Sequence, residues 1–341
     1  MDSGLAIGEF HHIAVVVSNI ETAMRGNSLF FGIRHWEFRR FEGDRLPGLE
    51  DNGFLSAMGS NGSGITLELL QPLAPNSPHA SFRSWRGEGM SHAVSRCTAE
   101  QFAELEKQLE QQGIGEVHRL NLYGKLRSLQ IDSRSLLSGL GLEVQVIDEA
   151  GGFDGLPVDR VVEYNFQPIL PVDKLYHVGI VVNNRDRAIA NFQSLLGFPE
   201  FLPLELEVGS SLSSVSLRGE TIDHAAKVAF SRVNGFCFEL MEPGPGKGAY
   251  QEFQSQYGEG MQHYFPTICD QSVLDAALPQ LRGEGVEVLL EGVIDGVMNY
   301  YYLDTDALLG GVTIEVICPH DADWMGEMGM TPEQGYLIGL G

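Results

Sequence analysis

Two hydrophobic periodicities alternate along this chain, and their order divides it into four similar segments. Short apolar runs such as 13–17 and 178–182 predict strands. Each run is followed by a stretch with the spacing of an amphipathic helix, which ends at a glycine. Further apolar runs then predict more strands before the pattern restarts. The sequence therefore predicts four copies of one βαβββ module.

Helix boundaries support this division. Two helices begin with a capping box, in which Ser or Thr is followed three residues later by Glu or Gln: Ser18 with Glu21, and Thr98 with Gln101. The third helix is expected over residues 185–196 and the fourth over about 272–281. The glycines at which the four helices are expected to end are Gly32, Gly113, Gly197 and Gly283.

The second pair of modules repeats the first at a nearly constant distance, from 177 − 12 = 165 to 315 − 143 = 172 residues. We therefore expect an α+β fold in which modules at about 9–75 and 87–148 form a first domain, 1–150. Modules at about 173–245 and 258–318 form a second domain, 173–320. The glycines and prolines of 151–172 predict a linker, and 321–341 is a C-terminal tail.

Each half contains two His and two Glu at matching points on predicted strands: His12, Glu68, His92 and Glu143, and then His177, Glu239, His263 and Glu315. The spacing from the first Glu to the second His is the same in both halves, 92 − 68 = 24 and 263 − 239 = 24. A single His in an apolar strand is usually a packing residue. Recurrence in all four modules favours metal ligands instead.

Imidazole and carboxylate ligands suit a divalent Fe, Mn, Co, Ni or Zn ion. With one set of ligands in each half, up to two ions per chain are expected. Ligands on strands leave one side of the ion open to substrate, which favours a catalytic ion over a structural one. Six histidines have no counterpart in the repeat and are expected to be surface or packing residues: His11, His35, His79, His118, His224 and His320.

The net charge of the chain limits the classes of partner that are expected. The chain of 341 residues has 22 Lys and Arg against 46 Asp and Glu, a net charge of −24. Such a chain repels nucleic acid and anionic membranes and disfavours a CoA thioester, so a small, neutral substrate is expected. The four scattered cysteines and the lack of a long apolar run indicate a cytoplasmic protein. A homodimer is left open.

From Phe10 to Cys318 the chain resembles the vicinal oxygen chelate superfamily, which includes glyoxalases, bleomycin resistance proteins and dioxygenases. The resemblance is carried by the four His and Glu pairs on repeated strands. It implies that two modules form one curved-sheet cup around a metal, so that four modules form two cups. It also implies the ligand role for the eight residues named above.

The sequence motifs ELLQPL at 68–73 and GEGMSH at 87–92 are most similar to those of the epimerase branch. This resemblance implies a metal-stabilised enediolate and movement of a proton next to a carbonyl. The stretches 52–58 and 225–230, however, lack the carboxylate that a methylmalonyl-CoA epimerase uses as a base. A neutral substrate similar to those of cyclitol-ketone epimerases fits better.

The catalytic candidates are the last ligand of each half, Glu143 and Glu315, together with Lys227, Tyr300 and Tyr302. Tyr300 and Tyr302 share one strand face because side chains alternate. These polar additions favour the second half as the active one. The alternatives are an Fe(II)-dependent extradiol or keto-acid dioxygenase, whose oxygen would compete with a fourth protein ligand, and a drug-binding resistance protein without chemistry.

Overall fold

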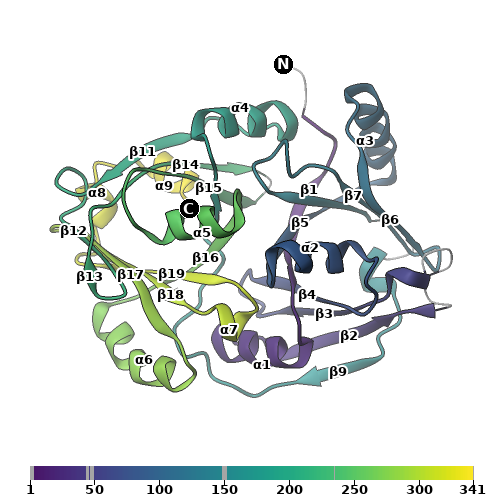
Figure 1. Ribbon diagram of the computed structural model, residues 1–341, viewed down its shortest axis with the longest axis horizontal. Coiled ribbons are helices and arrows are strands. Elements are labelled where there is room, and N and C mark those ends of the chain that lie inside the picture. The colour runs from purple at the N-terminus through teal and green to yellow at the C-terminus, as the bar shows by residue number, and fades with distance from the viewer. Residues whose placement is uncertain (1–3, 44–45, 47–49, 148–151, 234, 341) are drawn as a thin grey trace.

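A computed structural model describes residues 4–43, 46, 50–147, 152–233 and 235–340 of the protein. Their strands form two curved sheets that stand side by side, one from each half of the chain (Figure 1). The domain boundary expected at residue 150 lies outside the described residues. No helix in the described chain is long and apolar enough to cross a bilayer.

The sheets have corresponding strand orders. In sheet order, the first consists of β6 (Glu116–Leu122), β7 (Leu126–Ile131), β8 (Gly141–Val146), β5 (Gly89–Cys97), β1 (Glu9–Val16), β4 (Thr66–Pro72), β3 (Phe54–Ser60), β2 (His35–Phe41) and β9 (Arg160–Glu163). The second consists of β11 (Leu202–Glu207), β14 (Ala225–Val233), β15 (Phe236–Pro243), β10 (His177–Val181), β16 (Gly260–Ile268), β19 (Thr313–Pro319), β18 (Met298–Asp304), β17 (Glu287–Ile294), β12 (Ser214–Leu217) and β13 (Glu220–Thr221).

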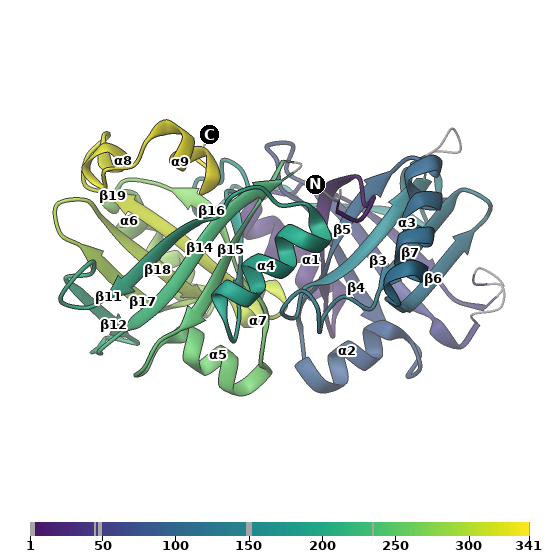
Figure 2. The ribbon, with the colours of Figure 1, turned by 90° about the horizontal axis from the view of Figure 1, so that it is seen from above.

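Nine helices accompany the sheets in the described chain: α1 (Ile20–Phe31), α2 (Pro78–Arg86), α3 (Ala99–Gln112), α4 (Arg185–Leu196), α5 (Ala249–Tyr257), α6 (Gln271–Gly283), α7 (Asp306–Leu309), α8 (Trp324–Glu327) and α9 (Pro332–Leu337). α2 and α5 follow corresponding strands and lie next to each other (Figure 2). Neither helix is among those expected from the sequence, although Ser77 and Pro78 form a typical helix start in front of α2.

The first strand of each half joins its two modules. β1 pairs in parallel with β4 of its own module and antiparallel with β5 of the next. β10 does the same with β15 and β16. Each pair of consecutive modules therefore shares one continuous sheet, with the ligand-bearing strands at its centre.

The helix caps confirm one expected capping box and correct the other. Thr98 and Gln101 form the predicted box in front of α3. At α1, however, the N-cap is Asn19, whose side chain accepts from the backbone N–H groups of Glu21 and Thr22. Ser18 instead donates its backbone N–H to Glu88. An Asx side chain is at least as good an N-cap as Ser, so the cap forms one residue later than expected.

The two halves meet through matched close contacts. Gly311 (φ +79°) packs on the backbone of Glu88, and Gly139 (φ +85°) packs on that of Glu259. A Cβ at either glycine would collide with the opposing backbone, and both φ values favour glycine. Phe10 adds a ring contact across the halves, with its centroid 5.4 Å from that of Phe238.

The predicted linker and tail both contain structure. Within the expected linker, Arg160–Glu163 forms β9, which extends the first sheet by pairing with β2. In the tail, α8 and α9 fold back over one end of the second sheet (Figure 2). Trp324 and Ile338 are buried there. The tail therefore becomes part of the wall of the second cup.

Candidate metal centre

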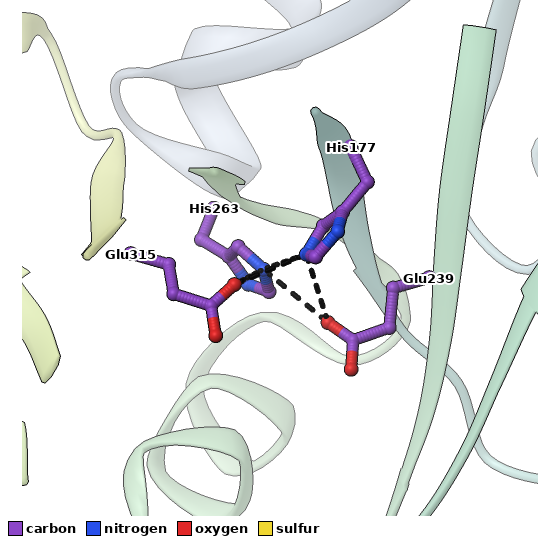
Figure 3. A group of neighbouring side chains, drawn as sticks. All are labelled: His177, Glu239, His263 and Glu315. Atoms are coloured by element: carbon purple, nitrogen blue, oxygen red, sulfur yellow. Dashed lines mark hydrogen bonds and ion pairs between the residues drawn. The ribbon is translucent and has the colours of Figure 1, made fainter. Parts of the chain in front are cut away.

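Four side chains from four neighbouring strands meet in the second cup. His177 opens β10 and Glu239 lies on β15, while His263 and Glu315 lie on β16 and β19. The sheet order β15, β10, β16, β19 makes these strands direct neighbours. Figure 3 shows both carboxylates turned towards the imidazole rings.

The potential ligand atoms lie at short range. His177 Nε2 is 3.0 Å from Glu315 Oε2 and 3.5 Å from Glu239 Oε2. His263 Nε2 is 3.4 and 3.3 Å from the same two oxygens and 3.3 Å from His177 Nε2. All four atoms lie within 4.8 Å of one another. Atoms that bind one divalent ion at about 2.1 Å lie roughly 3.0–3.4 Å apart, so this set fits such an ion.

The hydrogen bonds around the cluster leave ligand atoms of His263 and Glu239 available to an ion. Gln262 Oε1 lies 2.8 Å from His263 Nδ1, so it accepts the proton of that nitrogen and leaves the Nε2 lone pair facing the cluster. Glu239 Oε2 is buried and makes no hydrogen bond of good geometry in the described protein. A buried carboxylate oxygen without such a bond is costly, and a bound cation would satisfy it.

The imidazoles and carboxylates of the cluster shift each other's pKa values so that both kinds of group favour their charged forms. Burial alone lowers the pKa of His177, but the carboxylates of Glu239 and Glu315 outweigh it and raise this pKa to about 9. Burial alone raises the pKa of Glu315, but His177 and His263 lower it to about 2. The cluster therefore requires positive charge between its carboxylates, which a divalent ion supplies when it displaces the protons.

Gly179 makes the space that the ring of His263 fills. In the sheet, Gly179 on β10 lies between Glu239 and His263. A Cβ at this position would collide with ring atoms of His263. The φ of Gly179 lies outside the left-handed region, so the glycine is required here for space and not for backbone freedom. Ala14 occupies the corresponding position of the first half, between Glu68 and His92.

The four corresponding residues of the first half are separated into two pairs. His12 Nε2 lies 3.4 Å from Glu68 Oε2, and His92 Nε2 lies 3.4 Å from Glu143 Oε2. Among the described residues, the second cup holds the only group of three or more potential ligands within the 4.8 Å limit. A metal site in the first cup stays a prediction with weaker geometric support.

Electrostatics distinguish the cups as well. Burial and the nearby Glu143 raise the pKa of Glu68 to about 7. Burial and the positive charge of Arg96 lower the pKa of His12 to about 3. Both members of this pair therefore favour their neutral forms more than the matching residues of the second cup do. In addition, Ser56 Oγ donates to Glu68 Oε1 at 2.7 Å and holds that carboxylate.

The first cup is also filled. Its cavity has a volume of only about 20 Å³ and is narrowed by apolar side chains: Phe41, Phe54, Leu70, Leu120, Leu122 and Leu126. His79 and His118 line it too, which corrects their expected place outside any site. His79 on α2 stacks on His92 with ring centroids 6.2 Å apart. Its counterpart on α5 is Tyr250, a correspondence that becomes visible only once both helices are recognised.

The second cup has a larger cavity of about 80 Å³, with His177, Glu239 and Glu315 in its wall. Most of the remaining wall is apolar. The C-terminal tail closes one side with five residues: Trp324, Met328, Met330, Ile338 and Leu340. No role is expected for this tail from the sequence, because nothing in its composition shows where it folds back.

Tyr300 and Tyr302 both line this cavity, as expected from their shared strand face. Tyr302 OH lies 2.7 Å from Tyr250 OH, whereas Tyr300 OH is buried without a hydrogen-bond partner in the described protein. Lys227 is a correction. It points to the outer face of β14, half exposed, and pairs with Glu242 at 3.3 Å, because alternation along the strand turns its neighbour Val228 inward instead.

Residues 176–302 match the model of the Glyoxalase/Bleomycin resistance protein/Dioxygenase superfamily. This match includes three of the four ligand residues of the second cup and ends before Glu315. Together with the fold, it confirms the superfamily resemblance inferred from the sequence. No curated protein matches the sequence closely enough to count as a relative.

A solved structure confirms the α+β fold of two curved sheets. A triple mutant of 4-hydroxymandelate synthase from Streptomyces coelicolor aligns with a TM-score of 0.55 and 16% identity over 92% of this chain and 93% of that chain. The Mn(II)-bound glyoxalase from Novosphingobium aromaticivorans aligns with a TM-score of 0.44 and 12% identity, over 93% of this chain and 85% of that one. Methylmalonyl-CoA epimerase from Mycobacterium tuberculosis gives 0.34 and 19%, over 43% and 91%. At 16% identity, the likeness to the synthase concerns the fold and leaves the reaction open.

Proposed function

We propose that the protein is a metal-dependent epimerase or isomerase that moves a proton on the carbon next to a carbonyl group, with its active site in the second cup. The observation that carries this proposal is the convergence of four buried potential ligands, three of which, His177, Glu239 and Glu315, line a cavity. Fe, Mn, Co, Ni or Zn suits this ligand set. When bound, such an ion would polarise the carbonyl oxygen and acidify the neighbouring C–H bond.

Glu315 is the residue that we assign to proton transfer. Its carboxylate lines the cavity, and its lowered pKa keeps it anionic at neutral pH. Tyr300 and Tyr302 do not compete for this role, because burial and the nearby carboxylate of Glu315 raise the pKa of both phenols above the ordinary value. They hold their protons and act as hydrogen-bond donors. Lys227 is excluded as the base by its place outside the cup.

A dioxygenase that uses Fe(II) is the second candidate. The wall of the cavity is mostly apolar, and its only carboxylates among the described residues are the potential ligands Glu239 and Glu315. Ring or keto-acid oxidation would not require a separate base. Four protein ligands, however, leave fewer positions for a two-oxygen substrate together with O₂ than the usual three do.

Isotope exchange separates these candidates. Protein reconstituted with Zn, Mn or Fe(II) is incubated in deuterated water with 2-hydroxyacetophenone, a neutral hydroxyketone. We expect deuterium to enter the CH₂ group next to the carbonyl faster than in the buffer control, without oxygen uptake. Glu315→Gln, which keeps the side-chain shape, should slow exchange by about 10²-fold or more.

Oxygen consumption with catechol or phenylpyruvate, and no exchange, would establish the dioxygenase instead. Tight binding of 2-hydroxyacetophenone with neither exchange nor oxygen uptake would favour the drug-binding alternative.

A further inference from the structure

The wall of the second cavity is unusual in its charge. Apart from His177, Glu239 and Glu315, which belong to the metal cluster, the described residues that line it carry no acidic or basic side chain. Two carboxylates and one divalent ion cancel each other. A ligand that carried a charge on the part of its body away from the ion would find no partner for it, and an unpaired buried charge is strongly disfavoured.

The apolar part of the wall comes from both the sheet and the tail. Phe230 and Phe265 contribute from the strands, and Trp324 closes the opposite side. The volume of about 80 Å³ is roughly half that of an engineered apolar cavity of about 150 Å³ that binds benzene. The apolar body of a ligand must therefore be compact, no larger than a single ring.

One polar group in this wall is still unpaired. Tyr300 OH makes no hydrogen bond with any described residue, although the residue is only 6% exposed. The ring lies over Gly292 on β17, where any Cβ would collide with it, so the hydroxyl is held in place by packing. Buried hydroxyls are nearly always paired in proteins, which indicates that a ligand supplies the missing acceptor.

We propose that the second cup binds an uncharged compound with a single-ring apolar body and an oxygen that accepts a hydrogen bond from Tyr300. The proposal rests on the proposed function for the location of the reaction, but it concerns binding and is tested by binding alone. It excludes ligands that carry a carboxylate, a phosphate or a CoA group on the apolar body.

Three matched probes test the charge rule by calorimetry on the Zn-reconstituted protein: 2-hydroxyacetophenone, its 4-methyl derivative and its 4-carboxylate derivative. The metal-binding oxygens are the same in all three. The methyl compound controls for the added size, and we expect the carboxylate to bind at least about tenfold more weakly than the methyl compound does. Equal or tighter binding of the carboxylate would overturn the proposal.

Tyr300→Phe tests the hydrogen bond, with Tyr301→Phe as the matched control. Tyr301 OH bonds to Gln271 and Glu291 outside the cavity, so its loss should not change binding. Tyr300→Phe should weaken binding of 2-hydroxyacetophenone roughly two- to tenfold. It should leave thermal stability unchanged or raised, since the hydroxyl has no protein partner. A purely structural role predicts the reverse, a lower melting temperature with unchanged affinity.

These outcomes are distinct from those of the proposed function. If the carboxylate binds more weakly and Tyr300→Phe weakens binding, but no deuterium exchange occurs, the isomerase assignment is wrong and the ligand class is still supported. Exchange with a preference for the carboxylate would do the opposite.

Discussion

The first cup holds its His and Glu residues in two pairs, whereas the second brings all four within reach of one ion. The ligand types, the strand order and the register around Ala14 and Gly179 are the same in both. What differs is the space beside the second histidine. A methyl group at Ala14 stands where Gly179 leaves room for a ring. A complete set of ligands is therefore not enough to make a site.

The walls differ in the same direction. In the second cup Gly292 lies opposite Tyr300, and in the first cup Leu120 lies opposite Ser128. The larger side chain of the pair therefore comes from β18 in the second cup and from β6 in the first. Leu120 narrows the first cavity, while Tyr300 brings a hydroxyl into the second. As a result, side chains fill the first cup, whereas the second cup has space and a hydroxyl group for a ligand.

Removing a ligand histidine should have the largest effect. In His263→Ala the second cup loses a metal-binding nitrogen, and we expect affinity for Zn to fall by at least ~100-fold, more than the ~10–100-fold of a typical indirect effect. His92→Ala should leave that affinity unchanged. Competition with a chromophoric chelator measures both, and circular dichroism controls for folding. Loss of tight binding in His92→Ala, with His263→Ala unaffected, would reverse the assignment of the cups.

Gly179→Ala should have a smaller but still clear effect. The added Cβ must displace the ring of His263, so we expect metal affinity to fall about tenfold or more. Overpacking should lower the free energy of unfolding of the metal-free protein by about 1–3 kcal/mol. Gly283→Ala is the control, because nothing lies within 4 Å of a Cβ there. Unchanged metal affinity in Gly179→Ala would show that the ring has other room.

The reverse exchange in the first cup should have the smallest effect. Ala14→Gly makes room beside His92, and Ser56→Val releases Glu68, because Val228 occupies the corresponding position of the second half. In a His263→Ala background we expect this pair of changes to create weak Co(II) binding, visible in the d–d absorption spectrum. Ala→Gly in a strand should lower stability by about 0.5–1 kcal/mol. A spectrum identical to that of His263→Ala alone would mean that the leucines, and not Ala14, close the first cup.

Much of the fold was predictable because the repeat made weak signals additive. One His at the start of one strand says little, but four in register identified the modules and the ligand residues. The caps show the limit: Ser18 and Asn19 are both good N-caps, and only the contact of Ser18 with Glu88, which directly precedes β5, decides between them.

The unequal cups were not predictable from the ligand residues. The difference depends on Ala14 and Gly179, which are unremarkable in any strand until their cross-strand partners are known. Lys227 shows a related limit, because a shift of one residue along β14 turns a side chain from the cavity to solvent. The role of the tail was not predictable either, because only the folded structure shows that its apolar residues contact the second cup.

Metal stoichiometry tests the central comparison most directly. Metal-free protein is titrated with Zn by calorimetry, and the bound metal is then counted by elemental analysis after gel filtration. The geometry predicts one tightly bound ion per chain, retained in His92→Ala and lost in His263→Ala. Two ions bound with equal affinity would contradict the account, because the divided residues of the first cup would then bind as well as the convergent ones of the second.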